Sequence, residues 1–424
     1  MSRKLISLAI FAVTAALLLV PASLHAQGGG LLAMPPGLLL AGDEAGLFTI
    51  KADGTAKTYI LEDGAPNCWL RDGKWSPQGD QFIYTRICGG ESPSDWHADN
   101  RTADVYLYTP SVNSEVELEP TNGQFQNYAG DWHPTGSQVL IYSNRDLDRY
   151  NLYSVTVSSG DSSQVTNYES DLARASWDPT GRYLLYNRYI VDFTTVQWEI
   201  RVMDTTNGQE SFVAVGMTPN WSPDGKWISY VTSGDNFESA DVFIMPSDCI
   251  LNAERCNPER DAINLTYTPT VIEREPLWSL DQTQLFYLRD TNSDPSVETW
   301  DIFRQDIQTG TLENVTNTAD TSERHSEWER IDTPVTPIET VLPVIARVNT
   351  AQGAANMRSG PSTTDDIAAV LNNSQIVFVQ GQHEASDGVW YRIALPGDGT
   401  IGWLFHTLAA PVTGELLSVP VVTP

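Results

Sequence analysis

Four arginines stand at almost the same distance before a tryptophan in this 424-residue sequence. Arg71, Arg274 and Arg324 each lie four residues before a Trp, and Arg174 lies three residues before one. The chain holds 25 Lys and Arg against 54 Asp and Glu, so a shared position for its scarce cations is informative. Guanidinium groups that converge would form an anion-binding site suited to a carboxylate or a phosphate.

Two further residues share this position. Tyr128 lies four residues before another Trp, and His325 follows one of the arginines. We therefore predict a ligand-binding funnel with these residues: Arg71, Tyr128, Arg174, Arg274, Arg324 and His325. The alternative is that they are ordinary loop charges neutralised by nearby Asp72 and Glu275.

Catalytic motifs are mostly absent from the sequence. There is no G-x-S-x-G nucleophile elbow, no H-E-x-x-H zinc motif, no P-loop and no dinucleotide fingerprint. Asp290, Asn292, Asp294 and Asp301 follow the spacing of a calcium loop, but Pro295 takes the place of its turn glycine. We therefore expect a solvated loop there, no metal or other cofactor, and no enzymatic activity.

A repeat indicates the elements that must position these side chains. Each copy has Trp, a turn that usually reads Pro-x-Gly, and an alternating apolar strand, and three more strands complete the unit. Four strands in about 45 to 57 residues are typical of a propeller blade. The copies begin at Trp75, Trp132, Trp177, Trp221 and, in degenerate form, Trp278.

The two ends of the repeat region predict how the ring closes. Residues 37–61 supply three strands of a blade without its first strand, and the segment around Trp328 supplies a first strand without its continuation. Joined, they make a composite sixth blade that leaves no long sheet edge exposed. We expect the repeat tryptophans to pack between neighbouring blades; the alternative is that they stack on sugars.

The repeat resembles a known family. The Trp-Ser-Pro-Asp-Gly signature at 221–225 and its relatives are similar to the propeller of the periplasmic protein TolB. The segment 143–155 is similar to that family's link into its third strand, and the resemblance covers roughly residues 37–332. Such propellers serve both as scaffolds and as domains appended to peptidases, so the resemblance implies a fold more than a function.

A second domain follows a Pro/Thr-rich linker at 333–344. Residues 345–410 form a compact all-β pattern, and 345–408 closely resemble the bacterial Src-homology-3 (SH3)-type domain of exported and cell-wall proteins. We expect the tail, 411–424, to be disordered. The matching residues are Asn356, Arg358, Gly360, Pro361, Ser362, Trp390, Tyr391, Gly397, Asp398, Gly399, Gly402 and Trp403.

The SH3-type resemblance implies binding of a cell-wall peptide or of a protein partner. Arg358, Tyr391 and His406 are our candidates for its ligand surface. The alternative is that Arg358, the glycines and the tryptophans only hold the small barrel together.

The first 26 residues have the pattern of a secretory signal peptide, with Arg3 and Lys4 before a 16-residue apolar stretch and a cleavage site before Gln27. An uncleaved membrane anchor is the alternative. Residues 27–36 would then be an N-terminal linker, and no later stretch is apolar enough to span a membrane.

The four cysteines agree with export. Cys68 and Cys88 flank one apparent hairpin, and Cys249 and Cys256 bracket a polar excursion. An even count with local spacing predicts two disulfides. A zinc site is the alternative, but no C-x-x-C motif or His pair accompanies these cysteines.

Together these patterns predict an all-β protein, a six-bladed β-propeller with a small C-terminal SH3-like β-barrel. The net charge of −29 excludes a general nucleic-acid binder. We expect an exported protein, in the periplasm, on the cell surface or outside the cell. It would bind a cell-wall peptide or an envelope or extracellular protein without catalysis, and the sequence leaves its oligomeric state open. The alternative is a glycan hydrolase or lyase with its active site in the axial funnel.

Overall fold

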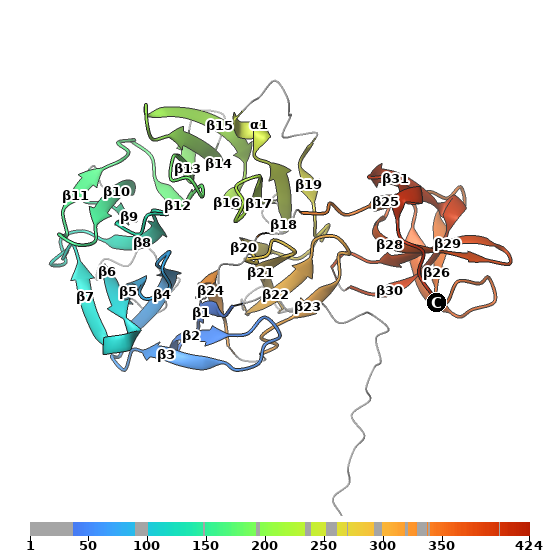
Figure 1. The fold of residues 1–424 in the computed structure, drawn as a ribbon, viewed down its shortest axis with the longest axis horizontal. Helices are drawn as coiled ribbons and strands as arrows, with labels where there is room; N and C mark the ends of the chain where they lie inside the picture. Colours follow the sequence, from blue (N-terminus) through green and yellow to red (C-terminus); the bar gives the residue numbers. More distant parts are fainter. Residues whose placement is uncertain are drawn as a thin grey trace, which may run out of the picture.

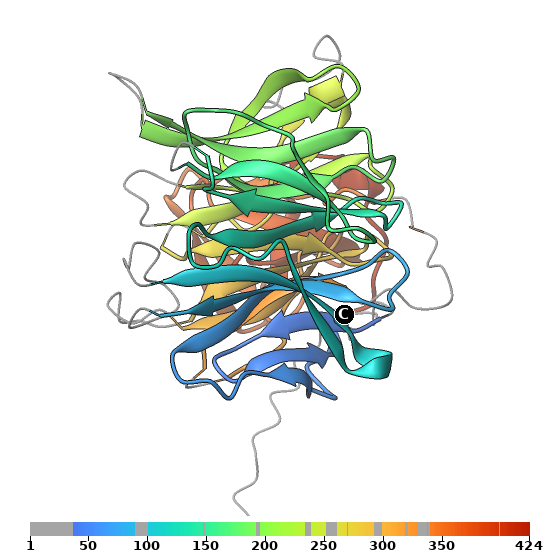
Figure 2. The ribbon, with the colours of Figure 1, turned by 90° about the vertical axis from the view of Figure 1, so that its left-hand side faces the viewer.

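In the described part of the chain, six four-stranded antiparallel sheets and one seven-stranded sheet make up the fold, seen in a computed structural model (Figure 1). Seen from the side, the strands of the propeller run across the thickness of the disc (Figure 2). None of the helices in the described part of the chain is long and apolar enough to cross a membrane. The structure describes residues 37–89, 101–146, 149–191, 196–233, 239–251, 261–268, 270–291, 299–318, 321–328, 337, 340–397 and 399–424.

Five blades are continuous in sequence. In each of them the strands follow one another along the chain from the axis outward. Blade 1 has β4 (Cys68–Trp75), β5 (Phe82–Cys88), β6 (Thr102–Thr109) and β7 (Ser114–Leu118), with the 3-10 turn η1 (Pro110–Val112). Blade 2 has β8 (Asn127–Trp132), β9 (Gln138–Ser143), β10 (Asn151–Thr156) and β11 (Ser162–Gln164). Blade 3 has β12 (Leu172–Trp177), β13 (Tyr183–Val191), β14 (Val196–Asp204) and β15 (Gln209–Val215). Blade 4 has β16 (Met217–Trp221), β17 (Trp227–Ser233), β18 (Ala240–Pro246) and β19 (Ile263–Asn264), with the short helix α1 (Asp248–Leu251). Blade 5 has β20 (Glu273–Trp278), β21 (Gln284–Asp290), β22 (Trp300–Asp306) and β23 (Leu312–Asn314).

The sixth blade is the predicted composite. Its innermost strand β24 (Arg324–Trp328) pairs antiparallel with β1 (Leu39–Gly42), which continues into β2 (Gly46–Ile50) and β3 (Thr58–Glu62). The register joins Leu39 to Trp328. The closure prediction is therefore confirmed, and with it the six-bladed ring.

The repeat tryptophans lie between blades, as predicted. Trp132 packs with Ile83 of the preceding blade, and its indole N–H donates to the backbone oxygen of Lys74 at 2.8 Å. Trp221 packs in the same way against Leu185 of blade 3. Each Trp thus fills the wedge between two twisted sheets, which favours close apolar contact over ligand stacking.

The turn after each Trp needs a left-handed backbone, which glycine supplies at Gly79, Gly136, Gly181 and Gly225, each with φ near +74°. A Cβ at Gly181 would lie 2.5 Å from the His133 ring of the preceding blade. In the degenerate copy Gln282 takes this conformation, with φ 63°. Its side-chain oxygen accepts a hydrogen bond from the backbone N–H of Asp224 in blade 4 at 2.9 Å, so the turn still contacts the preceding blade.

The C-terminal barrel has its strands in the order β27-β26-β30-β29-β28-β25-β31. Two 3-10 turns, η3 (His406–Leu408) and η4 (Leu416–Ser418), follow β30 and β31. The strands are β25 (Ile345–Val348), β26 (Ala354–Arg358), β27 (Ile367–Asn372), β28 (Ile376–Ala385), β29 (Gly388–Ala394), β30 (Ile401–Phe405) and β31 (Ala409–Thr413).

The prediction of a disordered tail from residue 411 was wrong. β31 extends to Thr413 and pairs with β25, and Val419 is buried in the barrel core. The composition of the tail, rich in Val and Pro, is weak evidence for disorder when a neighbouring strand edge can accept it.

The barrel packs directly on the propeller, beside blades 4 and 5 (Figure 1). Phe378 is fully buried in one apolar cluster with Leu265 and Ile307 of the propeller. The Gln380 amide donates to the backbone oxygen of Thr309 at 2.9 Å. The two domains therefore form a continuous core rather than two bodies joined by a linker alone.

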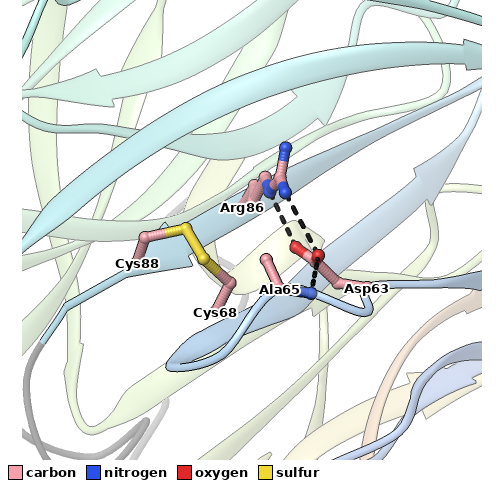
Figure 3. Close-up of a disulfide and its surroundings, with 5 residues drawn as sticks. All are labelled: Asp63, Ala65, Cys68, Arg86 and Cys88. Carbon is pink, nitrogen blue, oxygen red and sulfur yellow. Dashed lines mark hydrogen bonds and ion pairs between the residues drawn. A yellow bond between two sulfur atoms is a disulfide. The ribbon is translucent and has the colours of Figure 1, made fainter.

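One predicted disulfide is confirmed. Cys68 and Cys88 face each other in the register of β4 and β5 and are joined by an S–S bond (Figure 3). Beside it, the Arg86 guanidinium donates to both oxygens of Asp63, at 2.7 and 3.1 Å. Cys249 is also disulfide-bonded, and its predicted partner Cys256 lies outside the described residues.

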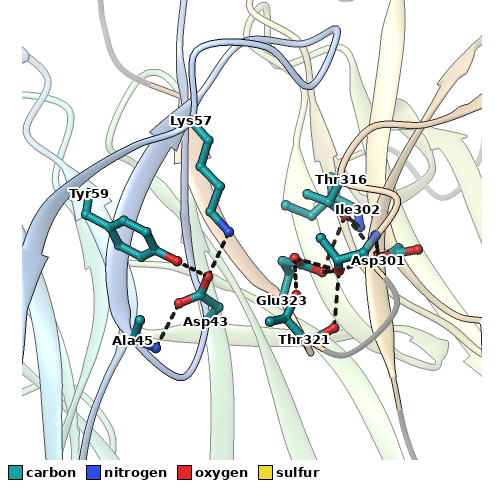
Figure 4. Close-up of polar contacts among 10 residues, drawn as sticks. Asp43, Ala45, Lys57, Tyr59, Asp301, Ile302, Thr316, Thr321 and Glu323 are labelled. Atoms are coloured by element: carbon teal, nitrogen blue, oxygen red, sulfur yellow. Dashed lines mark hydrogen bonds and ion pairs between the residues drawn. The ribbon is translucent and has the colours of Figure 1, made fainter. Parts of the chain in front are cut away.

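A buried carboxyl network braces the closing blade (Figure 4). The Thr318 hydroxyl lies 3.0 Å from a carboxyl oxygen of Asp301 in blade 5 and 3.0 Å from one of Glu323, just before β24. A hydroxyl can donate only one hydrogen bond, so a protonated Glu323 is needed to donate the other. Burial raises the pKa of Glu323 to about 7. Nearby, Lys57 and Tyr59 donate to Asp43 at 2.8 and 2.6 Å.

The same arrangement recurs between blades 4 and 5. The Thr268 hydroxyl lies 3.0 Å from Asp241 and 2.7 Å from Glu273, which has no exposed surface. Burial raises the pKa of Glu273 to about 8. Below the raised pKa of its glutamate, each network thus holds a proton between the end of one blade and the start of the next.

We predict that these two protons make stability depend on pH. The native pKa values exceed the usual 4.5, so the stabilisation is complete below about pH 4.5 and is lost as the pH rises through 7 and 8. One excess bound proton corresponds to about 1.4 kcal/mol per pH unit. The free energy of unfolding, measured with urea, should therefore fall less steeply between pH 5 and 9 in the Glu273→Gln/Glu323→Gln variant. Parallel profiles for variant and wild type would contradict the prediction.

We also predict that the domain interface is a stabilising core. Phe378→Ala should lower the free energy of unfolding by about 3 kcal/mol or more, because it leaves a cavity in a fully buried cluster. Phe212→Ala, at a side chain that is 52% exposed, is the matched control and should cost less than about 1 kcal/mol. Equal losses in the two variants would show that the interface is not packed as described.

Candidate functional site

Each innermost strand carries an irregularity just before its Trp. The antiparallel register shifts there in all six strands β4, β8, β12, β16, β20 and β24. At three of these bulges a charged residue has a left-handed backbone: Asp72 (φ 54°), Arg174 (φ 51°) and Glu275 (φ 55°). This conformation costs a residue with a Cβ about 1 kcal/mol or more, so the surrounding ring must impose it.

These three residues meet across the ring. Arg174 of blade 3 donates to Asp72 of blade 1 at 3.2 Å and to Glu275 of blade 5 at 2.5 Å. The partners are 102 and 101 residues away in sequence. Since they come from alternate blades, only the closed ring brings them together. We call Asp72, Arg174 and Glu275 the axial triad.

The two carboxylates of the axial triad more than balance the single positive charge of Arg174. Burial tends to lower the pKa of Arg174, but Glu275 and Asp72 outweigh it and hold that pKa above the ordinary range. The Arg174 side chain keeps 36% exposure, against 17% for Asp72 and 14% for Glu275. The alternative interpretation from sequence, arginine neutralised by these two acids, therefore describes Arg174.

Arg71 lies close to the axial triad and is 9% exposed. Burial lowers the pKa of Arg71, and the positive charges of Arg174 and Arg101 act in the same direction. Three guanidinium groups thus gather near two carboxylates. Arg101, 5% exposed, was missed by the sequence analysis because it precedes a third strand and has no fixed spacing from a Trp.

The remaining predicted funnel residues are placed differently. Tyr128 is buried, with its ring 5.6 Å from that of Tyr150 in edge-to-face contact. The Arg274 guanidinium lies over the Trp300 ring, 4.5 Å from its centroid. The side chains of Arg324 and His325 lie outside the described residues, although their backbones pair with β1. The structure thus brings together Arg71 and Arg174, and anion binding by this group stays a prediction.

The three candidates in the barrel have unequal access to solvent. Tyr391 was expected on a ligand surface, but it is 5% exposed and packs in the barrel core. Burial also raises the pKa of Tyr391. Arg358 is half-buried and donates to the backbone oxygen of Asp365 at 2.6 Å. His406 is half-buried, with Nδ1 3.1 Å from the backbone oxygen of Val389.

Most of the calcium-like loop, residues 292–298, lies outside the described residues. Asp301 is buried and accepts hydrogen bonds from Asn314 at 2.7 Å and from the backbone N–H of Thr318 at 3.1 Å. Within the described ranges, no group of three or more His, Cys, Asp or Glu could hold a metal ion.

The fold predicted from sequence is confirmed: this is a six-bladed β-propeller with an appended bacterial SH3-type barrel. The bacterial SH3 domain family matches residues 353–408. An uncharacterized protein of Agrobacterium fabrum is 27% identical over 187 residues, which cover 41% of this chain and 57% of that protein. An uncharacterized peptidase of Bacillus subtilis is 22% identical over 116 residues, 27% of this chain and 17% of that protein. The chain therefore spans less than two thirds of the length of either relative.

Solved structures with a similar fold share little sequence. The structure of a TolB-like protein from Agrobacterium tumefaciens has 13% identity and a TM-score of 0.45, covering 69% of this chain and 99% of that one. TolB from Acinetobacter baumannii has 13% identity and a TM-score of 0.42, covering 88% and 78%. An oligogalacturonate lyase from Vibrio parahaemolyticus has 11% identity and a TM-score of 0.40, covering 88% and 97%.

We predict that the axial triad contributes to the stability of the ring. Arg174→Met would remove the guanidinium that binds both carboxylates and would increase their mutual repulsion, so the free energy of unfolding should fall by about 2 kcal/mol. Adding Glu275→Gln should recover at least half of that loss, because it removes the repulsion. Urea unfolding measures both changes.

The matched control is Arg182→Met. Arg182 pairs with Asp204 at 2.7 Å, but its side chain is 51% exposed, so its loss should leave the unfolding midpoint unchanged within error. A similar response of the two variants would mean that the contacts across the axis add nothing to an ordinary surface ion pair.

Proposed function

We propose that this protein is an exported, non-enzymatic binding protein of the cell envelope. The propeller is its platform for a protein or peptide partner, and the SH3-type barrel is its tether to cell-wall material or to an envelope protein. Periplasm, cell surface and exterior are all compatible with this role.

The observation that carries the proposal is the shared core of the two domains. With Phe378 buried between the barrel and blade 5, the surfaces of the propeller and of the barrel hold one fixed orientation. A rigid pair of surfaces loses little freedom when it binds, which favours recognition of large partners. A linker alone would leave the barrel free to turn.

The propeller would accept an acidic group of its partner near the axis. Arg71, Arg101 and Arg174 lie around Asp72 and Glu275. Arginine recognises carboxylates and phosphates by paired hydrogen bonds. A partner carboxylate would compete with Asp72 or Glu275 for Arg174.

A glycan hydrolase or lyase remains the alternative, since Asp72 and Glu275 do come together at the axis. Arg174 lies between the two carboxylates, however, and binds both. A general acid also needs a raised pKa and access to substrate. Glu273 and Glu323 have raised pKa values but no exposed surface. These points support binding over catalysis.

Co-sedimentation with purified peptidoglycan tests the tether. The chain from Gln27 onward should pellet with the polymer, and Arg358→Ala/His406→Ala should reduce the pelleted fraction at least threefold. Arg182→Ala, which removes a charge from the propeller surface, is the control and should pellet as the wild type does. Separate domains are unsuitable for this experiment, because they would expose Phe378.

Either of two results would overturn this part of the proposal. If the wild type stays in the supernatant, the barrel does not tether the protein to the cell wall. If the double variant pellets as the wild type does, Arg358 and His406 are not part of the ligand surface.

A further inference from the structure

One strand of the barrel carries an added peptide segment. The four residues Val419–Val422, which we call the tail segment, lie parallel to β28 at Gln382. The Gln382 N–H donates to the backbone oxygen of Pro420 at 2.8 Å, and the Val422 N–H donates to the backbone oxygen of Gln382 at 2.9 Å. These are the hydrogen bonds of β-augmentation, in which a sheet accepts an extended peptide.

Side chains of β28 hold the two ends of the tail segment. The Gln382 amide donates to the backbone oxygen of Val419 at 3.0 Å. His383 Nδ1 lies 3.2 Å from the backbone oxygen of Val422, an acceptor, so this nitrogen carries the proton. Four hydrogen bonds thus bind the backbone of the tail segment, so they do not depend on the side chains of the peptide.

Only some side chains of the tail segment make apolar contacts with the barrel. Val419 enters the barrel core and is 6% exposed. Val422 lies against Gly381, where a Cβ would come within 2.6 Å of its Cγ1. The Val421 side chain is 80% exposed, so it does not contribute to selectivity. The site therefore selects an apolar residue at the position of Val419 and a β-branched residue at the position of Val422. The two residues between them need only an extended backbone.

Proline fits the second position of this pattern. Only the carbonyl of Pro420 is used, so its missing N–H costs no hydrogen bond. Its fixed φ favours the extended backbone that pairing requires. The site thus suits a Val-Pro-x-Val segment. Because Gly381 has no side chain, the last residue of this segment can approach the backbone of β28.

We propose that the edge of β28 along Gly381–His383 is a peptide-binding site, filled here by the chain's own tail segment. Its intended occupant is an extended Val-Pro-x-Val segment of a partner protein, which displaces the tail segment. The inference rests on the proposed role of the barrel as a tether and names the chemistry of one partner. Only Val419 of the tail segment is deeply buried, so exchange needs little disruption of the core.

The edge of β28 along Gly381–His383 lies close to the propeller. Gln380, two residues before Gln382 on β28, donates to Thr309 and Thr311 at the turn between β22 and β23. A partner peptide that pairs with this edge of β28 would therefore lie beside the junction of the two domains.

Fluorescence anisotropy with a labelled peptide tests the proposal. The probe has the sequence of Ser418 to Pro424, and the protein is either the full chain from Gln27 or the same chain ending at Ser418. The tail segment competes at a high effective concentration in the full chain. The dissociation constant should therefore be at least tenfold lower for the shortened chain.

Two substitutions provide the controls. Gly381→Val in the shortened chain should abolish binding, because its side chain would occupy the place of Val422. Gly64→Val is the matched control, since a Cβ at Gly64 meets nothing within 4 Å, and it should leave binding unchanged. A peptide with Asp in the place of Val422 should not bind.

If the shortened chain fails to fold, Val422→Gly in the full chain replaces it, because it weakens the tail segment without removing Val419. This variant should bind the peptide more tightly than the wild type. Equal affinity for the full and weakened chains, or no binding to either, would overturn the proposal. Peptidoglycan sedimentation is a separate readout, so intact pelleting together with failed peptide binding would reject this inference alone.

Discussion

The pairing of β24 with β1 is the constraint on which the rest of the structure depends. Strands from opposite ends of the propeller sequence share one sheet, and without this sheet the ring would expose two unpaired edges. Leu39 and Phe48 of the closing blade pack with Trp300 of blade 5, so the same contact also buries apolar surface. The carboxyl network of Asp301, Thr318 and Glu323 lies beside this junction and adds directional contacts to it.

Closure also determines what happens at the axis. Once six innermost strands face one another, the bulges of alternate blades come within hydrogen-bond distance, and Arg174 binds Asp72 and Glu275. The left-handed backbone at all three residues is unfavourable in isolation. It is tolerated because neighbouring blades hold each strand in place. The axis therefore combines positive and negative groups in a rigid frame.

The barrel extends this rigidity beyond the ring. Phe378 fits against Gly310, where even a Cβ would come within 2.4 Å of its ring, so the contact depends on a residue without a side chain. The surfaces of the propeller and of the barrel are thereby fixed relative to each other. The proposed peptide-binding edge along Gly381–His383 lies next to this junction, because Gln380 of the same strand contacts blade 5.

The sequence by itself determined the features that depend on local pattern and period. The Trp-containing repeat predicted four-stranded blades, their number and the composite closure, and the spacing of Cys68 and Cys88 predicted their disulfide. Only the tertiary structure decided which charges meet. Arg174 and its two partners are 102 and 101 residues apart, and their distance depends on the diameter of the closed ring, which no local pattern encodes. The same holds for Tyr391, whose burial follows from the curvature of the barrel, and for the tail segment, whose Val- and Pro-rich composition resembles disorder until the edge of β28 accepts it.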